Sequence, residues 1–138
     1  MAERIAVYMA GFPSFLLYFL VAVALLAAFS FIYAKITPDH EWTLVKQKNS
    51  AAAIAFGGAI IGFVLPLHSA ITQSISLLDC VLWGIVALII QIAAYYGLRL
   101  AIRDLPTRVA NGEMATGILA AAFFVGVGLL NAASMTYY

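Results

Sequence analysis

The residues best suited to chemistry in this chain are a few polar side chains set inside long apolar runs. His68 is ionisable, and an ionisable group inside a membrane segment is a candidate for proton transfer or ligand contact. Gln91 and Asn131 carry amides that need hydrogen-bond partners in lipid. With Ser30 and Thr116 they form the candidate lining of a polar path. Each also has a structural alternative, such as a neutral histidine bonded to a neighbouring helix or hydroxyls bonded to their own helix carbonyls.

The sequence provides no set of residues typical of an enzyme or a metal centre. Its two histidines, His40 in the first connection and His68 at the outer end of the second span, are predicted below to lie on opposite sides of a membrane, without further ligands at metal-binding spacing. No Ser–His–acid set or phosphate loop is apparent. Cys80 is the single cysteine, which excludes an intrachain disulfide. We therefore expect a protein that is not an enzyme and binds no cofactor.

The composition indicates that these polar residues sit in a membrane protein. The chain has 138 residues, of which 65% are hydrophobic and 9% are charged. Soluble domains are about half apolar and a quarter charged. The net charge of +1 also argues against a nucleic-acid partner, because a binding face for phosphates would be strongly basic. The lipid bilayer is the environment that this composition fits.

Four apolar stretches approach or exceed the roughly 20 residues that a spanning helix needs. They are Phe12–Ala34, Ser50–Ile71, Leu77–Leu98 and Met114–Met135. Helices are expected because every backbone polar group in lipid must be satisfied internally. The predicted fold is an all-α integral membrane protein with four transmembrane helices in a single domain, residues 1–138.

The positive charges predict the orientation of these spans. The first connection carries three lysines and the third carries three arginines, whereas the middle connection has neither residue type. Short loops rich in Lys and Arg face the cytoplasm, so both termini are expected to face outward from a bacterial inner membrane. Such residues could also bind anionic lipid, although fixing the topology explains them sufficiently. The six cations are Lys35, Lys46, Lys48, Arg99, Arg103 and Arg108.

Two proline-containing segments predict where helices begin in the basic connections. In "TPDHE", Thr37 is a candidate N-cap and Pro38 a candidate first helical residue, so the second span is expected to start ahead of the membrane. In "DLPTR", Pro106 predicts a similar start for the fourth span, although Gly112 argues against a continuous helix there.

An offset of 64 residues aligns the two halves of the chain. Both halves contain an uncharged span, a basic connection and a span rich in small residues. This layout predicts two parallel two-helix units, residues 12–72 and 76–136. The aligned pairs include Lys35 with Arg99, Ala51 with Ala115 and Gly62 with Gly126.

Small residues predict which helices pack at the centre. Gly58 and Gly62 form a Gly-x-x-x-Gly pair, and the offset of 64 places Ala122 and Gly126 at the equivalent positions. Helices in lipid associate by close backbone approach, so the second and fourth spans are expected to form the packing centre. Pro66 is expected to bend the second span near Gly62.

Several segments resemble one known family. "YAKITPDHEWTLVKQKNSAAAIAFGGAIIGFVLPLHSAI", "LLDCVLWGIVALIIQ" and "GLLNAASMTY" resemble the YjfL-like family of small bacterial inner-membrane proteins, a domain of unknown function that often occurs as tandem two-helix units. The resemblance implies four spans in two units and an envelope-stress setting, but no activity or catalytic residue. Ser134 stands where many relatives carry cysteine, so this member does not require a thiol there.

Two functions follow from these observations. The first is a non-enzymatic inner-membrane module that assembles with itself or with a membrane protein partner in an envelope-associated stress system, docking through its cytoplasmic connections. The alternative is an oligomeric small channel or carrier with a polar path near His68, Gln91 and Asn131.

Overall fold

The computed structural model describes residues 1–37 and 41–135, in which six helices follow one another along the chain. Four of them are long and apolar enough to cross a membrane. The other two, α2 and α5, have six residues each. The elements are α1 (Ala2–Ile36), α2 (Glu41–Lys46), α3 (Ser50–Gln73), α4 (Leu77–Ala101), α5 (Leu105–Ala110) and α6 (Met114–Ser134).

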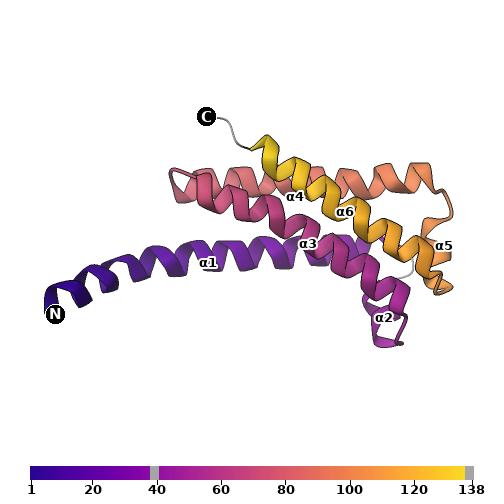
Figure 1. Ribbon diagram of the computed structural model, residues 1–138, viewed down its shortest axis with the longest axis horizontal. Coiled ribbons are helices and arrows are strands. Elements are labelled where there is room, and N and C mark those ends of the chain that lie inside the picture. Colours follow the sequence, from indigo (N-terminus) through magenta and orange to yellow (C-terminus); the bar gives the residue numbers. More distant parts are fainter. Residues whose placement is uncertain (38–40, 136–138) are drawn as a thin grey trace.

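The four long helices run along a common axis, with the two short helices at one end (Figure 1). The N-terminus, the α3–α4 connection and the C-terminal end of α6 lie toward the other end. The end with α2 and α5 is called the basic end here, because six cations belong to the helix ends and turns there. They are Lys35, Lys46, Lys48, Arg99, Arg103 and Arg108.

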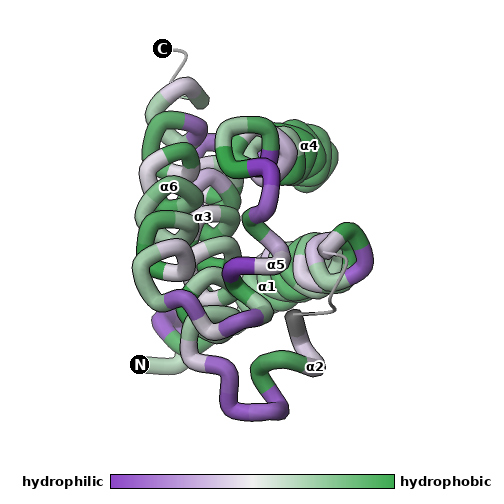
Figure 2. The backbone as a smooth tube through the Cα atoms, turned by 90° about the vertical axis from the view of Figure 1, so that its right-hand side faces the viewer, coloured by the Kyte–Doolittle hydropathy of each residue, from purple (hydrophilic) through white to green (hydrophobic). Residues whose placement is uncertain are grey.

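Helices α3 and α6 lie side by side along one side of the bundle, with α4 and α1 on the other side (Figure 2), and they make the most extensive contact between two helices. Of the most apolar 18 residues of each helix, 56% are buried in α3 and 33% in α6. Alanine and glycine dominate the buried face of α3, which lets the two backbones approach closely. The pair corresponds to the second and fourth predicted spans.

Helix α1 is the longest helix and the least buried of the four long ones. Its 35 residues extend over about 52 Å, more than the roughly 30 Å of a hydrocarbon core. Only 6% of its most apolar 18 residues are buried, and residues 1–17 are all exposed. The helix begins ten residues ahead of the predicted span at Phe12, and its first part projects beyond the α3–α4 connection (Figure 1).

An aromatic cluster holds the second half of α1 against the bundle. The ring of Tyr33 lies 5.7 Å from Phe56, 5.4 Å from Tyr95 and 5.9 Å from Phe124, so it contacts α3, α4 and α6 together. Stacked and edge-on aromatic pairs of this kind stabilise beyond the area that they bury. The second half of α1 therefore attaches to all three of the other long helices.

The two short helices end in the same backbone motif. Lys48 (φ 65°) and Gly112 (φ 77°) adopt the left-handed conformation after α2 and α5. The next residue in each case, Asn49 or Glu113, donates its N–H to a carbonyl five residues earlier, at 2.9 and 3.0 Å. This Schellman motif ends each short helix. The predicted early starts of the second and fourth spans are therefore wrong, because α2 and α5 are separate helices.

Thr37, the predicted N-cap, is the C-cap of α1, and the helix start that it was predicted to cap lies outside the described residues. Its hydroxyl donates to the carbonyls of Tyr33 (3.1 Å) and Ala34 (3.0 Å), and its N–H also bonds to Tyr33. Pro38 and His40 lie outside the described residues. Pro106 does occupy the first turn of a helix, but that helix is α5. A proline at this position loses no helical hydrogen bond.

Candidate functional site

The two amide side chains of the predicted path meet where α4 and α6 pack. Gln91 is 2% exposed and Asn131 is 8% exposed. The Asn131 Nδ2 lies 3.5 Å from the Gln91 Oε1 and donates to it. These two residues are called the amide pair below.

Both members of the amide pair also bond to helix backbones. The Gln91 Nε2 donates to the Phe124 carbonyl on α6, and the Asn131 Nδ2 donates to the Ala87 carbonyl on α4, each at 3.4 Å. The pair therefore links α4 and α6 in both directions. Amide groups neither gain nor lose a proton near neutral pH, so the pair suits helix association or contact with a polar ligand rather than acid–base chemistry.

Close backbone contacts surround the amide pair. A Cβ placed on Gly62 would overlap the Phe124 carbonyl and lie 3.0 Å from the Gln91 Nε2. A Cβ placed on Gly128 would overlap the Gly62 carbonyl. Glycine at both positions therefore allows α3, α4 and α6 to converge here, and the amides are packed tightly against the helices.

Pro66 belongs to the same contact. It is buried, and α3 continues through it from Ser50 to Gln73. Proline has no N–H to offer the carbonyl one turn earlier, which is that of Gly62. That carbonyl faces Gly128 on the neighbouring helix, where a C–H···O contact of the kind found between helices can form. A proline thus fits this turn of α3 because the backbone of α6 approaches it.

The face by which α6 contacts α3 differs from the predicted one. A Cβ on Gly117 would lie 2.7 Å from the Ala51 carbonyl, whereas one on Gly126 would meet nothing within 4 Å. Ala122 is exposed. The predicted packing role of Ala122 and Gly126 is therefore wrong for this contact, since the offset of 64 residues points to the neighbouring face of α6. On α3, the predicted Gly58 and Gly62 both lie in the contact.

A sequence signal for the true face was present. Gly117 and Gly128 are eleven residues apart, which is three helical turns, so both lie on one face of α6. Asn131 follows Gly128 by three residues and belongs to the same face. The glycine period within one helix was therefore a better guide than the comparison between halves.

The remaining residues of the predicted path are not hydrogen-bonded to the amide pair. His68 is exposed on α3, and Ser30 is half-buried on α1. Thr116 is buried near the start of α6, where its hydroxyl donates to the Glu113 Oε1 at 2.8 Å. The structure thus joins two of the five predicted residues, Gln91 and Asn131.

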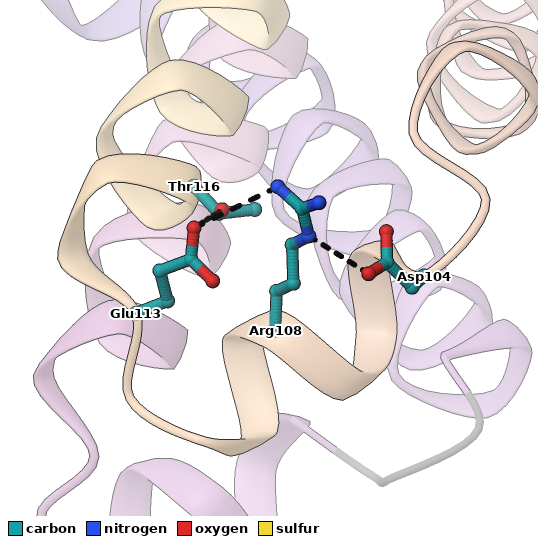
Figure 3. A network of polar contacts seen from close by, with 4 residues as sticks. All are labelled: Asp104, Arg108, Glu113 and Thr116. Atoms are coloured by element: carbon teal, nitrogen blue, oxygen red, sulfur yellow. Dashed lines mark hydrogen bonds and ion pairs between the residues drawn. The ribbon is translucent and has the colours of Figure 1, made fainter.

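Arg108 organises a polar network at the basic end (Figure 3). Its Nε donates to the Asp104 Oδ2 at 2.9 Å, and its Nη1 lies 3.7 Å from the Glu113 Oε1. The hydrogen bond from Arg108 lowers the pKa of the exposed Asp104 below its ordinary value. The guanidinium of Arg108 therefore interacts with two carboxylates of its own chain. The network connects α5 to the start of α6.

Asn49 forms a second link at the basic end that the sequence analysis missed. Its Oδ1 accepts the Ala52 N–H at 3.1 Å and so caps α3. Its Nδ2 donates to the carbonyls of Val109 (3.0 Å) and Ala110 (3.1 Å) at the end of α5. An asparagine directly before an apolar run is a recognisable cap signal. Its second contact depends on the position of α5, about 60 residues away, which no local pattern predicts.

Comparison with known proteins assigns the chain to a family. The family model described as Domain of Unknown Function (DUF350) matches residues 7–135. The chain belongs to the DUF350 family. This confirms the family resemblance expected from the sequence. No solved structure matches the chain.

The alignments with two curated relatives cover most of this chain and most of each relative. The "UPF0719 inner membrane protein YjfL" of Escherichia coli (strain K12) is 40% identical over 124 residues, which is 90% of this chain and 94% of that protein. The "UPF0719 transmembrane protein YshE" of Bacillus subtilis (strain 168) is 26% identical over 120 residues, covering 86% and 90%. Both names place these relatives in membranes, and neither names a reaction or a ligand.

This DUF350 protein has a small cavity toward its basic end. A cavity of about 20 Å³ lies among Tyr33, Tyr95, Phe124 and the buried side of α5. That volume accommodates about one water molecule. Within residues 1–37 and 41–135, no three His, Cys, Asp or Glu side chains are grouped as metal ligands. The polar contacts described above, the amide pair and the two links at the basic end, all join parts of the helix bundle.

Proposed function

We propose that this DUF350 protein is a non-enzymatic module of the inner membrane that assembles with further copies of itself or with a membrane protein partner. The exposure of α1 carries the proposal, because a helix long enough to span the membrane leaves 94% of its most apolar 18 residues unburied. The name of the Escherichia coli relative supports the inner membrane as the location.

The first half of α1 presents a regular aromatic face. The ring of Phe15 lies 6.1 Å from that of Phe12 and 5.8 Å from that of Phe19, and all three are more than half exposed. Residues at this spacing lie on one side of a helix. In a bilayer this face meets either lipid or another helix, and stacked rings offer a broad and rigid contact area for a helix.

The buried polar groups support a role in assembly rather than in catalysis. Gln91, Asn131 and Thr116 are neutral, and their hydrogen bonds run to helix backbones or to a nearby carboxylate. Interhelical bonds from such side chains are a common means of holding membrane helices together. The charged residues belong to the ends of the molecule, where a partner or lipid headgroups could contact them.

We also propose that the chain consists of two parallel two-helix units with both termini outward and the basic end in the cytoplasm. The two short helices support the units, since they end 64 residues apart, and α3 and α6 also start 64 residues apart. The matching turns at Lys48 and Gly112 share the same offset. The orientation rests on the Lys and Arg content of the connections.

The α2 side of the basic end is the proposed docking face. Lys46 and Lys48 are exposed, and the Lys46 Nζ lies 5.5 Å from the ring centre of the exposed Trp42. Arg108 is bound to Asp104 and contributes little to such a face. A partner with an acidic surface fits these lysines, and the family resemblance suggests an envelope-stress setting for it.

The alternative of an oligomeric channel or carrier has less support. Both members of the amide pair pack against helix backbones, and His68 lies on the exposed side of α3. A path through these residues would have to form between several copies of the chain.

Affinity purification from native membranes tests the docking face. We expect Lys46→Glu/Lys48→Glu to abolish recovery of the partner, while Arg4→Glu, at the opposite end, leaves it intact. A topology reporter must show that both variants insert as the native protein does, because charge reversal can invert a membrane protein. Unchanged recovery with the double variant would rule out docking through α2.

A further inference from the structure

We propose that Tyr96, Arg99 and Arg103 form a binding site for the phosphate of an anionic membrane phospholipid. These residues, with Leu100, line an open hollow of about 430 Å³ at the C-terminal end of α4. Arg99 and Leu100 follow Tyr96 by three and four residues within α4, and Arg103 comes two residues after α4 ends. Side chains at i, i+3 and i+4 share one side of a helix, so the hollow has a polar edge and an apolar edge.

Among the described residues, the two arginines have no carboxylate partner, in contrast to Arg108. Both ion pairs among the described residues belong to Arg108, which contacts Asp104 and Glu113. Neither Arg99 nor Arg103 pairs with a carboxylate that the structure describes. Two guanidinium groups beside one hollow suit a phosphate, because each can donate two parallel hydrogen bonds to its oxygens.

The depth of the hollow matches that of a lipid headgroup. Asp79 and Arg99 are the charged residues nearest the two ends of α4, and their separation of 20 positions corresponds to about 30 Å of helix. This equals the thickness of a typical hydrocarbon core, so Arg99 falls at the level of the phosphates when Asp79 lies at the other surface. Tyr96 lies one turn deeper, where tyrosine is enriched in membrane proteins.

The apolar edge distinguishes a lipid from free phosphate. Leu100 is 79% exposed and Tyr96 is 45% exposed, so both offer surface to an acyl chain beside the arginines. A free phosphate ion would use the arginines and leave this surface uncovered. The helix dipole accounts for Arg99 in the last turn of α4, but it does not account for Arg103, which lies beyond the capping residue Ile102.

Lipid titration of the purified full-length protein tests this site, independently of any assembly function. Binding of phosphatidylglycerol and of phosphatidylcholine would be counted by native mass spectrometry. We expect a preference for phosphatidylglycerol that Arg99→Gln/Arg103→Gln lowers about 30-fold, the effect of removing two surface cations near a phosphate. Lys46→Gln/Lys48→Gln removes the same charge from the same end and should retain the preference.

A second variant pair separates a built site from general attraction. Arg99→Lys/Arg103→Lys keeps the charge and the fold but removes the bidentate donors, so it should lose much of the preference. Full binding by this pair, or equal losses in the arginine and lysine variants, would overturn the site. Absence of a lipid preference would do the same. Displacement of phosphatidylglycerol by inorganic phosphate would identify the free ion as the ligand and overturn the assignment to lipid.

Discussion

At the scale of single residues, the contact between Gly62 and Gly128 sets how closely α3 and α6 approach. The Gly62 carbonyl, which Pro66 leaves without its helical donor, faces the position where any side chain on Gly128 would stand. The amide pair packs against the same crossing, because a Cβ placed on Gly62 would lie 3.0 Å from the Gln91 Nε2. A hydrogen-bonded amide layer and close glycine contacts thus stabilise one crossing together.

We predict that Gly128→Ala destabilises the protein by about 1–3 kcal/mol, the typical cost of forcing an extra group into a packed interior. Gly126→Ala is the matched control on the same helix, because its Cβ would meet nothing within 4 Å. Alanine there should be neutral or gain up to about 1 kcal/mol from helix propensity. Unfolding in detergent would be followed for both variants, and equal stability would contradict the assigned crossing.

The Asp104–Arg108 pair predicts a local pH dependence. The hydrogen bond from Arg108 lowers the folded-state pKa of Asp104 below its unfolded value. The pair therefore stabilises α5 at pH values above the ordinary range of aspartate, and it loses this contribution as the pH falls through the lowered folded value. The effect on global stability should be small, because both side chains are exposed.

Carboxyl carbon NMR of labelled aspartate measures this shift directly. We expect Arg108→Gln to raise the pKa of Asp104 toward its ordinary value, whereas Lys46→Gln should leave it unchanged. If Asp104 titrates identically with and without Arg108, the pair does not persist in solution.

At the scale of helices, the spans were predictable and the short helices between them were not. Three predicted spans start at the observed residues Ser50, Leu77 and Met114 and end within three residues of the helices. The length of an apolar run determines them. The length of an apolar run does not predict α2 and α5 as separate helices, because a single left-handed residue, Lys48 or Gly112, separates each from the following span.

The candidate site was predictable in part for a related physical reason. Gln91 and Asn131 stand out because polar groups are rare inside apolar runs. Their meeting depends on how α4 and α6 are rotated about their axes, which the offset between the two halves does not determine. The same rotation explains why Gly117 and Gly128 contact α3 while Gly126 does not.

The turn after α5 provides a prediction at this scale. Gly112 has φ 77°, a conformation that costs other residues about 1–2 kcal/mol. Gly112→Ala should therefore destabilise the turn by that amount and increase amide hydrogen exchange in α5. Gly97→Ala is the control, since Gly97 lies within α4 and a Cβ there would meet nothing within 4 Å. Equal exchange in both variants would contradict a turn that depends on Gly112.

At the scale of the whole molecule, the bundle consists of a well-packed centre and one weakly attached helix. The α3–α6 pair makes the most extensive helix contact, and the second half of α1, from Ala22 to the aromatic cluster around Tyr33, packs against the bundle. The remaining face of α1, with its stacked phenylalanines, is available to another helix. In our proposals, the basic end offers separate surfaces to a partner near α2 and to lipid near α4. This division of surfaces is the basis for an assembling module.

The size of the assembly in native membranes tests this account most directly. The protein would be released in mild detergent and weighed by native mass spectrometry, with Phe12→Ala/Phe15→Ala/Phe19→Ala as a variant of the exposed face of α1. We predict a discrete complex of several copies, or of one copy with another membrane protein, that the variant dissociates. A single chain of 138 residues without a protein partner, recovered at every detergent concentration, would contradict the central claim.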